Sequence, residues 1–171
     1  ALPVGPNERL MRRRLYCRVQ SQIQEYIDVD ALASAALKRL HDEWRSRCRG
    51  PRIPARADFD PAEMGYILGN LSLVEVRRHP LRLFFRVHAS NIATRVGFDM
   101  TRKFLDECPD VRYRSLILDH YLRTLDERRP IAARHEQDVT DQTVLNCEAL
   151  ALPLAHDGEN VDMMMTGVTW R

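Results

Sequence analysis

The first fifty residues carry apolar side chains at helical spacing. Between residues 31 and 49 they recur every fourth position and share one side of a helix: Leu32, Ala36, Leu40, Trp44 and Cys48. This pattern predicts an amphipathic helix that ends near Gly50-Pro51, because proline lacks an amide donor and disfavours helical geometry in the residue before it. Residues 8 to 29 predict a second, moderately amphipathic helix from Leu10, Leu15, Val19, Ile23 and Ile27.

The segments that follow predict a linker and further helices. Residues 51 to 61 hold three prolines and predict an ordered linker, followed by a short helix that begins near Pro61 with Asp60 as its cap. Residues 91 to 107 contain a glycine among their apolar positions, which favours short helical turns. Residues 110 to 129 carry a wide apolar stripe and predict a helix of about five turns.

Five stretches have the alternating or β-branched pattern of strands and are bounded by turn residues. They are residues 71 to 78, 81 to 90, 131 to 139, 144 to 155 and 161 to 170. Because tight turns force neighbouring strands to pair antiparallel, the element order predicts an α+β fold: a five-stranded antiparallel sheet with helices on one face. Residues 1 to 30 are expected to form an N-terminal helical extension, and residues 31 to 171 the domain itself.

Composition and charge narrow the class of protein. Apolar residues make up 44% of the chain and charged residues 29%, which is typical of a soluble globular domain. No apolar run approaches the roughly 20 residues that cross a bilayer, and residues 1 to 11 lack the features of a secretory signal. We therefore expect a cytoplasmic protein without a membrane partner. The formal net charge is +2, with an excess of arginine near the amino terminus at Arg12, Arg13, Arg14 and Arg18.

Motifs for catalysis are absent from the sequence. The 7 glycines form no phosphate-binding loop, and the 4 cysteines and 6 histidines show no short metal-ligand spacing. Cys147 and His135 could be combined into a nucleophile and a base, but we favour structural packing, since free cysteine is among the most buried residue types. The sequence predicts no enzyme and no catalytic residue, and it leaves any cofactor unknown.

Several spaced motifs between residues 37 and 170 resemble those of a bacterial family of PAS-like proteins. They comprise a tryptophan helix, a proline-arginine-aspartate linker, a hairpin that ends in arginine, and further positions toward the carboxy terminus: Trp44; Pro54, Arg56, Asp58 and Asp60-Pro61; Leu68, Leu71 and Val74-Glu75-Val76; Phe85-Arg86; Gly97; Pro130; and Leu152-Pro153-Leu154. The resemblance implies a PAS-like fold and a sensory or regulatory role, and it supplies neither ligand nor reaction. It also implies that a ligand would lie between the sheet and the helices.

Six residues are candidates for ligand binding there: Phe85, Arg86, His88, Tyr121, His135 and Cys147. The alternative is a fully packed core, because protein interiors leave few voids. Strand alternation turns Phe85 to the core and Arg86 away from it. Arg86 is therefore expected in solvent or in an ion pair with a carboxylate such as Glu75 or Asp99, and a contact to an anionic ligand is the second interpretation.

The sequence thus favours a sensory or regulatory PAS-like domain that binds a small molecule or a protein partner. A homodimer is expected, paired through the helices that precede the first strand, and a signalling protein is a possible further partner. Two other classes stay open: a small α+β enzyme with a pocket under the sheet, and a nucleic-acid-binding regulator that uses the basic amino terminus. Nucleic acid is the less favoured partner, since charge runs usually form solvated helix faces.

Overall fold

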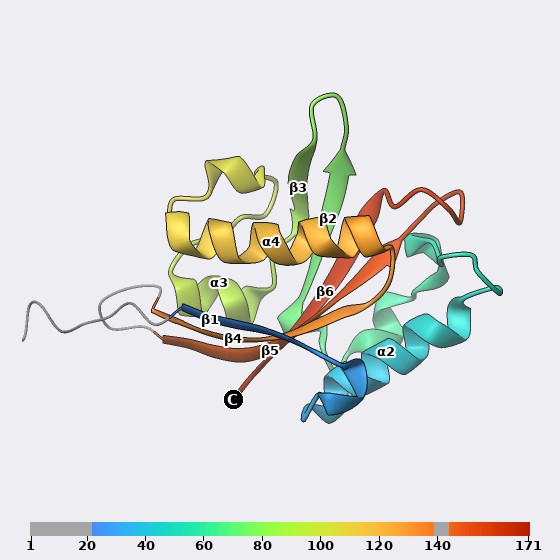
Figure 1. The fold of residues 1–171 in the computed structure, drawn as a ribbon, viewed down its shortest axis with the longest axis horizontal. Coiled ribbons are helices and arrows are strands. Elements are labelled where there is room, and N and C mark those ends of the chain that lie inside the picture. Colours follow the sequence, from blue (N-terminus) through green and yellow to red (C-terminus); the bar gives the residue numbers. More distant parts are fainter. Residues whose placement is uncertain (1–21, 139–143) are drawn as a thin grey trace, which may run out of the picture.

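The computed structural model describes residues 22–138 and 144–171. Its strands form one antiparallel sheet in the order β1-β4-β5-β6-β2-β3 (Figure 1). In chain order these strands are β1 (Gln22–Ile27), β2 (Leu71–Arg77), β3 (Arg82–Val87), β4 (Ile131–Asp138), β5 (Val144–Leu154) and β6 (Met163–Trp170). The described helices are α2 (Ala35–Arg47), α3 (Ser90–Val96) and α4 (Val111–Glu127), with short 3-10 turns η1 (Val29–Ala31), η2 (Arg56–Asp58), η3 (Pro61–Met64), η4 (Leu68–Asn70) and η5 (Leu105–Glu107).

The predicted α+β fold and antiparallel sheet are confirmed. Each of the five predicted strands is present, and the short helix at Pro61 has Asp60 as its cap, with the Asp60 side chain accepting from the Ala62 amide. The predicted count of five strands is wrong, because β1 adds a sixth strand beside β4.

Strand β1 occupies part of the stretch in which a helix was predicted. Ile23 and Ile27 are four residues apart, a spacing that fits one face of a helix and equally one side of a strand. The edge of β4 offers unpaired backbone groups, and pairing with β1 satisfies them. The Tyr26 hydroxyl also donates to Asp119 of α4 at 2.5 Å. The helical prediction is therefore wrong for residues 22–27, and its earlier part lies outside the described residues.

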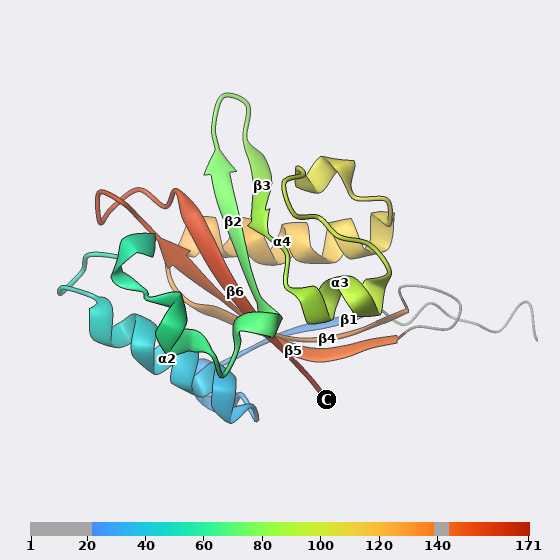
Figure 2. The ribbon, with the colours of Figure 1, turned by 180° about the vertical axis from the view of Figure 1, so that it is seen from behind.

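Helices cover both faces of the sheet, so the prediction of helices on one face is also wrong. A Cβ at Gly167 of β6 would lie within 3.0 Å of Leu37 and Leu40, which places α2 against that face. The neighbouring residues Thr166 and Val168 point the opposite way, toward α4. Figure 1 shows α4 crossing in front of the strands, and Figure 2, from behind, brings α2 to the front.

Helix α2 is fixed at both ends. The Ser34 hydroxyl caps its first turn by accepting from the Leu37 amide at 3.3 Å. Trp44, predicted as the anchor of this helix, is 8% exposed, and its indole N–H donates to the Pro153 carbonyl at 2.8 Å. Buried aromatic and leucine side chains therefore hold α2 on β5 and β6.

Helix α4 presents its polar aromatic side chains to the other face. The Asp110 carboxylate caps the helix by accepting from the Tyr113 amide at 2.8 Å, and Arg128, in the left-handed conformation, ends it. Its buried positions include Tyr113, His120 and Tyr121. These three side chains reach the layer between helix and sheet, where the candidate site lies.

Candidate functional site

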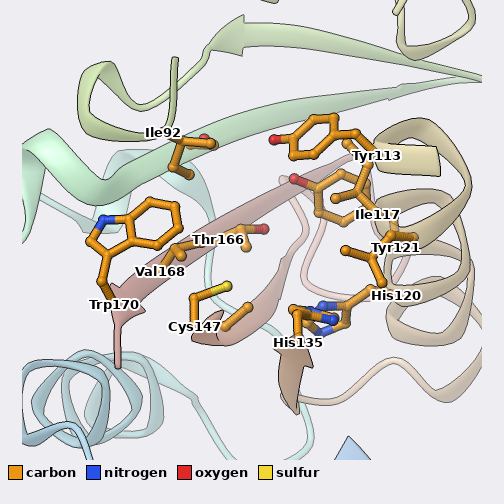
Figure 3. A pocket seen from close by; sticks show the side chains of 13 residues that line it. Ile92, Tyr113, Ile117, His120, Tyr121, His135, Cys147, Thr166, Val168 and Trp170 are labelled. Atoms are coloured by element: carbon orange, nitrogen blue, oxygen red, sulfur yellow. The ribbon is translucent and has the colours of Figure 1, made fainter. Parts of the chain in front are cut away.

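A cavity of about 40 Å³ lies between α4, α3 and the sheet (Figure 3). This volume holds a water molecule or a few heavy atoms. The wall mixes aliphatic side chains with hydroxyl, imidazole, indole and thiol groups, contributed by Ser72, Ile92, Tyr113, Leu116, Ile117, His120, Tyr121, His135, Cys147, Ala149, Thr166, Val168 and Trp170. These described lining residues include no carboxylate, lysine or arginine, so the cavity is mostly apolar with a few uncharged polar groups.

Two tyrosines of α4 bring hydroxyl groups to the cavity. Figure 3 shows the rings of Tyr113 and Tyr121 next to each other, with both hydroxyls pointing away from α4 into the cavity. Burial raises the pKa of Tyr121 to about 12, partly offset by the Thr166 hydroxyl, and burial holds the pKa of Tyr113 well above its usual value. Both phenols therefore keep their protons at neutral pH and can donate hydrogen bonds.

The neighbouring His88 determines which way Tyr113 donates. The Met100 amide donates to His88 Nδ1 at 3.2 Å, so the ring proton belongs on Nε2, which lies 3.1 Å from the Tyr113 oxygen. Tyr113 thus accepts from His88 and keeps its own O–H for another partner. Burial lowers the pKa of His88, which favours this neutral imidazole.

Two further histidines close one end of the cavity. His120 Nε2 donates to the Ile131 carbonyl at 2.9 Å, and its ring centroid lies 5.5 Å from that of His135. Burial lowers the pKa of His120 to about 4, and burial together with His120 lowers the pKa of His135 to about 3. Both rings are neutral at pH 7, so this end of the cavity has imidazole hydrogen-bonding groups without charge.

Three polar atoms at the cavity have no hydrogen-bond partner among the described residues. They are Nδ1 of His135, Oγ1 of Thr166 and Nε1 of Trp170, and each is buried. The Thr166 hydroxyl is near enough to Tyr121 to lower the pKa of that phenol, and Figure 3 shows the indole nitrogen of Trp170 on the side of its ring away from the cavity. Such an atom costs about 1 to 3 kcal/mol if it stays unsatisfied, so buried polar groups are nearly always paired with protein or bound water. A bound water or small molecule with its own donors and acceptors would pair such atoms.

Comparison with known families agrees with this architecture. A family model described as PAS domain matches residues 32–169, which is most of the chain. The chain belongs to the PAS domain family. No curated protein and no solved structure matches it. The resemblance to PAS-like proteins is therefore confirmed, and with it a sensory or regulatory type of domain.

The structure of this PAS domain separates the six predicted site residues into three groups. Tyr121, His135 and Cys147 line the cavity. Phe85 and His88 are buried next to it, with ring centroids 5.4 Å apart, and they act on the cavity through neighbours such as Tyr113. Arg86 does not line the cavity.

Arg86 forms the ion pair that the sequence favoured. Its Nη1 lies 3.0 Å from Glu75 Oε1, and Arg77 contacts the other oxygen of the same carboxylate at 3.0 Å. The Arg86 side chain is 56% exposed, so this pair sits at the surface and contributes about 0 to 1 kcal/mol. The outer side of β3, from which Arg86 projects, faces solvent.

Cys147 is a packing residue in this structure. It is 4% exposed, and burial raises the pKa of its thiol to about 12. The neutral thiol is a poor nucleophile and a poor metal ligand. Across residues 22–138 and 144–171, no group of three or more histidine, cysteine or acidic side chains is placed to hold a metal ion.

Sequence reasoning did not select several residues that complete the site. Tyr113, Thr166 and Trp170 each bring a polar group to the cavity. The signal for Thr166 and Trp170 was their even spacing in the last strand, which puts both on the face of Val168.

The basic positions 12 to 18 lie outside the described residues. In the described part of the chain, no helix is long and apolar enough to cross a membrane.

Proposed function

We propose that this PAS domain senses a small, uncharged molecule in the cavity between α4 and the sheet, and that it passes the signal on by protein–protein contact. The observation that carries the proposal is the space itself, together with the two buried polar atoms without a hydrogen-bond partner, on His135 and Thr166, whose residues line it. A fully packed core would have matched these atoms with protein partners.

The lining restricts the chemistry of the ligand. Because its histidines are neutral at pH 7 and it contains no charged side chain, a charged ligand would be buried without a counter-charge. Tyr113 and Tyr121 offer hydroxyl donors, so a ligand with a hydrogen-bond acceptor suits the cavity. Aliphatic groups such as Ile117 and Val168 suit a short carbon chain. Small alcohols, ketones and amides meet these conditions.

The wall next to Trp170 gives the cavity a way to adapt to its ligand. The Arg95 guanidinium of α3 lies 4.2 Å from the centre of the Trp170 ring, a cation–π contact at the end of β6. Trp170 is half-buried, so its indole can turn without opening the core. A shift of Trp170 and α3 on binding would carry the signal from the cavity to the surface.

The test is ligand-observed NMR with a panel of neutral alcohols, ketones and amides of up to about six heavy atoms. An Ala149→Leu variant fills the cavity, and Ala35→Leu at the exposed start of α2 is the matched control. We expect binding to the wild type and to Ala35→Leu, and none to Ala149→Leu. Unchanged binding to Ala149→Leu would show that the ligand binds outside this cavity. If the wild type binds none of the compounds, the cavity holds water and the proposal is wrong.

We also propose that the protein acts as a homodimer. PAS domains commonly mediate protein interactions and dimerisation, and the described surface offers an apolar groove of about 360 Å³ between the β2–β3 hairpin and α4. Leu81, Leu118 and Leu122 at this groove are 50%, 38% and 37% exposed. A second copy of the chain is the occupant that would cover these leucines, and other signalling proteins are alternatives.

The division of the chain into residues 1–30 and residues 31–171 also remains a proposal. In this view the extension contributes β1 to the sheet of the domain that follows it.

A further inference from the structure

We infer that the arginine-lined hollow between the end of α2, the linker and the loop after β5 is a second binding site, for a small anion of phosphate chemistry. The hollow has a volume of about 170 Å³ and is lined by Arg47, Arg49 and Arg52, together with Asp58, His156 and residues 53–55, 155 and 158. It shares no residue with the cavity under α4.

A tight turn brings two of these arginines together. The amide of Arg49 donates to the Arg52 carbonyl and the amide of Arg52 to the Arg49 carbonyl, both at 3.3 Å, around Gly50 with a φ of 63°. Residues directly opposite in such a bridge project their side chains to the same side, about 5 Å apart at Cβ. Like charges in this position repel each other. The two arginines therefore concentrate positive charge at the turn and lower its stability.

The protein orients Arg52 without neutralising it. Its Nη2 donates to the Asp157 carbonyl at 2.5 Å, and Gly158, with a φ of 79°, lies so close that a Cβ there would be 2.6 Å from Arg52 Nε. The Asp157 carboxylate turns to its own loop instead, where it accepts from the amides of Glu159 and Asn160. The guanidinium is therefore held by a neutral acceptor and keeps its charge.

Arg47 is positioned in a similar way from the other side. It donates to the carbonyls of Asp58 at 2.7 Å and Glu43 at 3.0 Å, and it lies over the Phe59 ring. Its carboxylate partner is Glu63, at 3.2 Å and 65% exposed. Two arginines are thus pre-organised by backbone carbonyls, which reduces the entropy lost when an anion binds.

The charge balance of the hollow points to an anion. Asp58 is the carboxylate among its described lining residues, and its Oδ2 accepts from the Ala55 amide at 2.8 Å. Arg49 and Arg52 make no ion pair with any carboxylate in the described part of the chain. Planar guanidinium groups match the oxygens of phosphate two at a time, and three of them around one space favour a multiply charged oxyanion over a single carboxylate.

The experiment is calorimetric titration of the full chain with inorganic phosphate and with pyrophosphate, at about 0.15 M salt so that distant charges are screened. Malonate serves as a dicarboxylate comparison. We expect at least one of the two phosphate probes to bind more tightly than malonate. Arg49→Gln and Arg52→Gln should each weaken it roughly tenfold or more, the loss expected for a charge-assisted hydrogen bond.

Arg45→Gln is the matched control. Arg45 is an exposed arginine of α2, the helix that also carries Arg47, and it does not line the hollow. It should change the affinity less than about twofold. The exposed Arg49 side chain makes no hydrogen bond or ion pair among the described residues, so Arg49→Gln tests the site with little effect on the fold. Absence of binding by both phosphate probes, equal or tighter binding of malonate, or an equal loss in Arg45→Gln would each overturn the proposal.

Discussion

At the scale of single residues, burial separates two carboxylates that the sequence does not distinguish. Glu75 pairs with Arg77 and Arg86, whose side chains are at least half exposed. Glu148 is 1% exposed and accepts from the amides of Ala33 and Ser34, at 2.9 and 3.0 Å, and from Arg134 at 3.2 Å. Glu148 therefore ties β5 to the start of α2, whereas Glu75 lies in a surface network.

We predict that Glu148→Gln lowers the free energy of unfolding by roughly 3 kcal/mol, because the amide leaves backbone donors unsatisfied and Arg134 without its counter-charge. Glu75→Gln is the matched substitution at the surface and should lower it by about 1 kcal/mol or less. Urea denaturation of the two variants and the wild type measures both values. Equal losses would contradict the contrast between buried and exposed carboxylates.

For single residues, the sequence predicted which side chains pair better than it predicted how exposed they are. The motif and the strand alternation pointed to Glu75 or Asp99 as a partner of Arg86, and Glu75 is the one that it meets. Their exposure depends on what covers the outer side of β3, which belongs to other segments of the chain. The unsatisfied atoms of Thr166 and Trp170 likewise became visible only when α4 and β6 were brought together.

At the scale of helices and strands, clear hydrophobic periodicity predicted most elements correctly, and an ambiguous periodicity gave one wrong prediction. Strands β2 to β6 and helices α2 and α4 follow from their periodicity. Strand β1 was missed because an apolar spacing of four is even, so it satisfies a strand as well as a helix. The position of α2 on the second face was also missed, since a linker and a helix can follow either side of a sheet. Gly167, which makes room for Leu37 and Leu40, was the residue that marked this face.

We predict that β1 is part of the stable sheet. A truncated chain that begins at Asp28 loses the whole β1–β4 ladder and the Tyr26 contact to Asp119, and it leaves β4 as an open edge. It should melt several degrees lower than a chain that begins at Gln22 and should aggregate more readily, since exposed edges pair with other chains. Circular dichroism melts and light scattering measure the two effects. Identical melts would show that β1 adds nothing to the stability of the sheet.

At the scale of the whole molecule, the helix layers on the two faces of the sheet separate the two proposed binding sites. The layer under α4 encloses the cavity, and the opposite side, at the end of α2, carries the arginine-lined hollow. The apolar groove between the β2–β3 hairpin and α4 lies on the same helix that supplies Tyr113 and Tyr121. A ligand that moves α4 would therefore alter this groove directly, which connects sensing to association.

The proposed homodimer through this groove can be tested with one substitution and a matched control. Leu118→Glu places a charge in the groove, where a second copy would bury it, so we expect the dimer to dissociate at least tenfold more readily. Leu68→Glu introduces the same change at another exposed leucine, in η4, and should leave the association unchanged. Light scattering across a range of protein concentrations measures both, and melts of the monomeric fraction check the fold. A wild type that stays monomeric at high concentration, or a Leu118→Glu variant as dimeric as Leu68→Glu, would assign the groove to a different signalling partner or leave it without one.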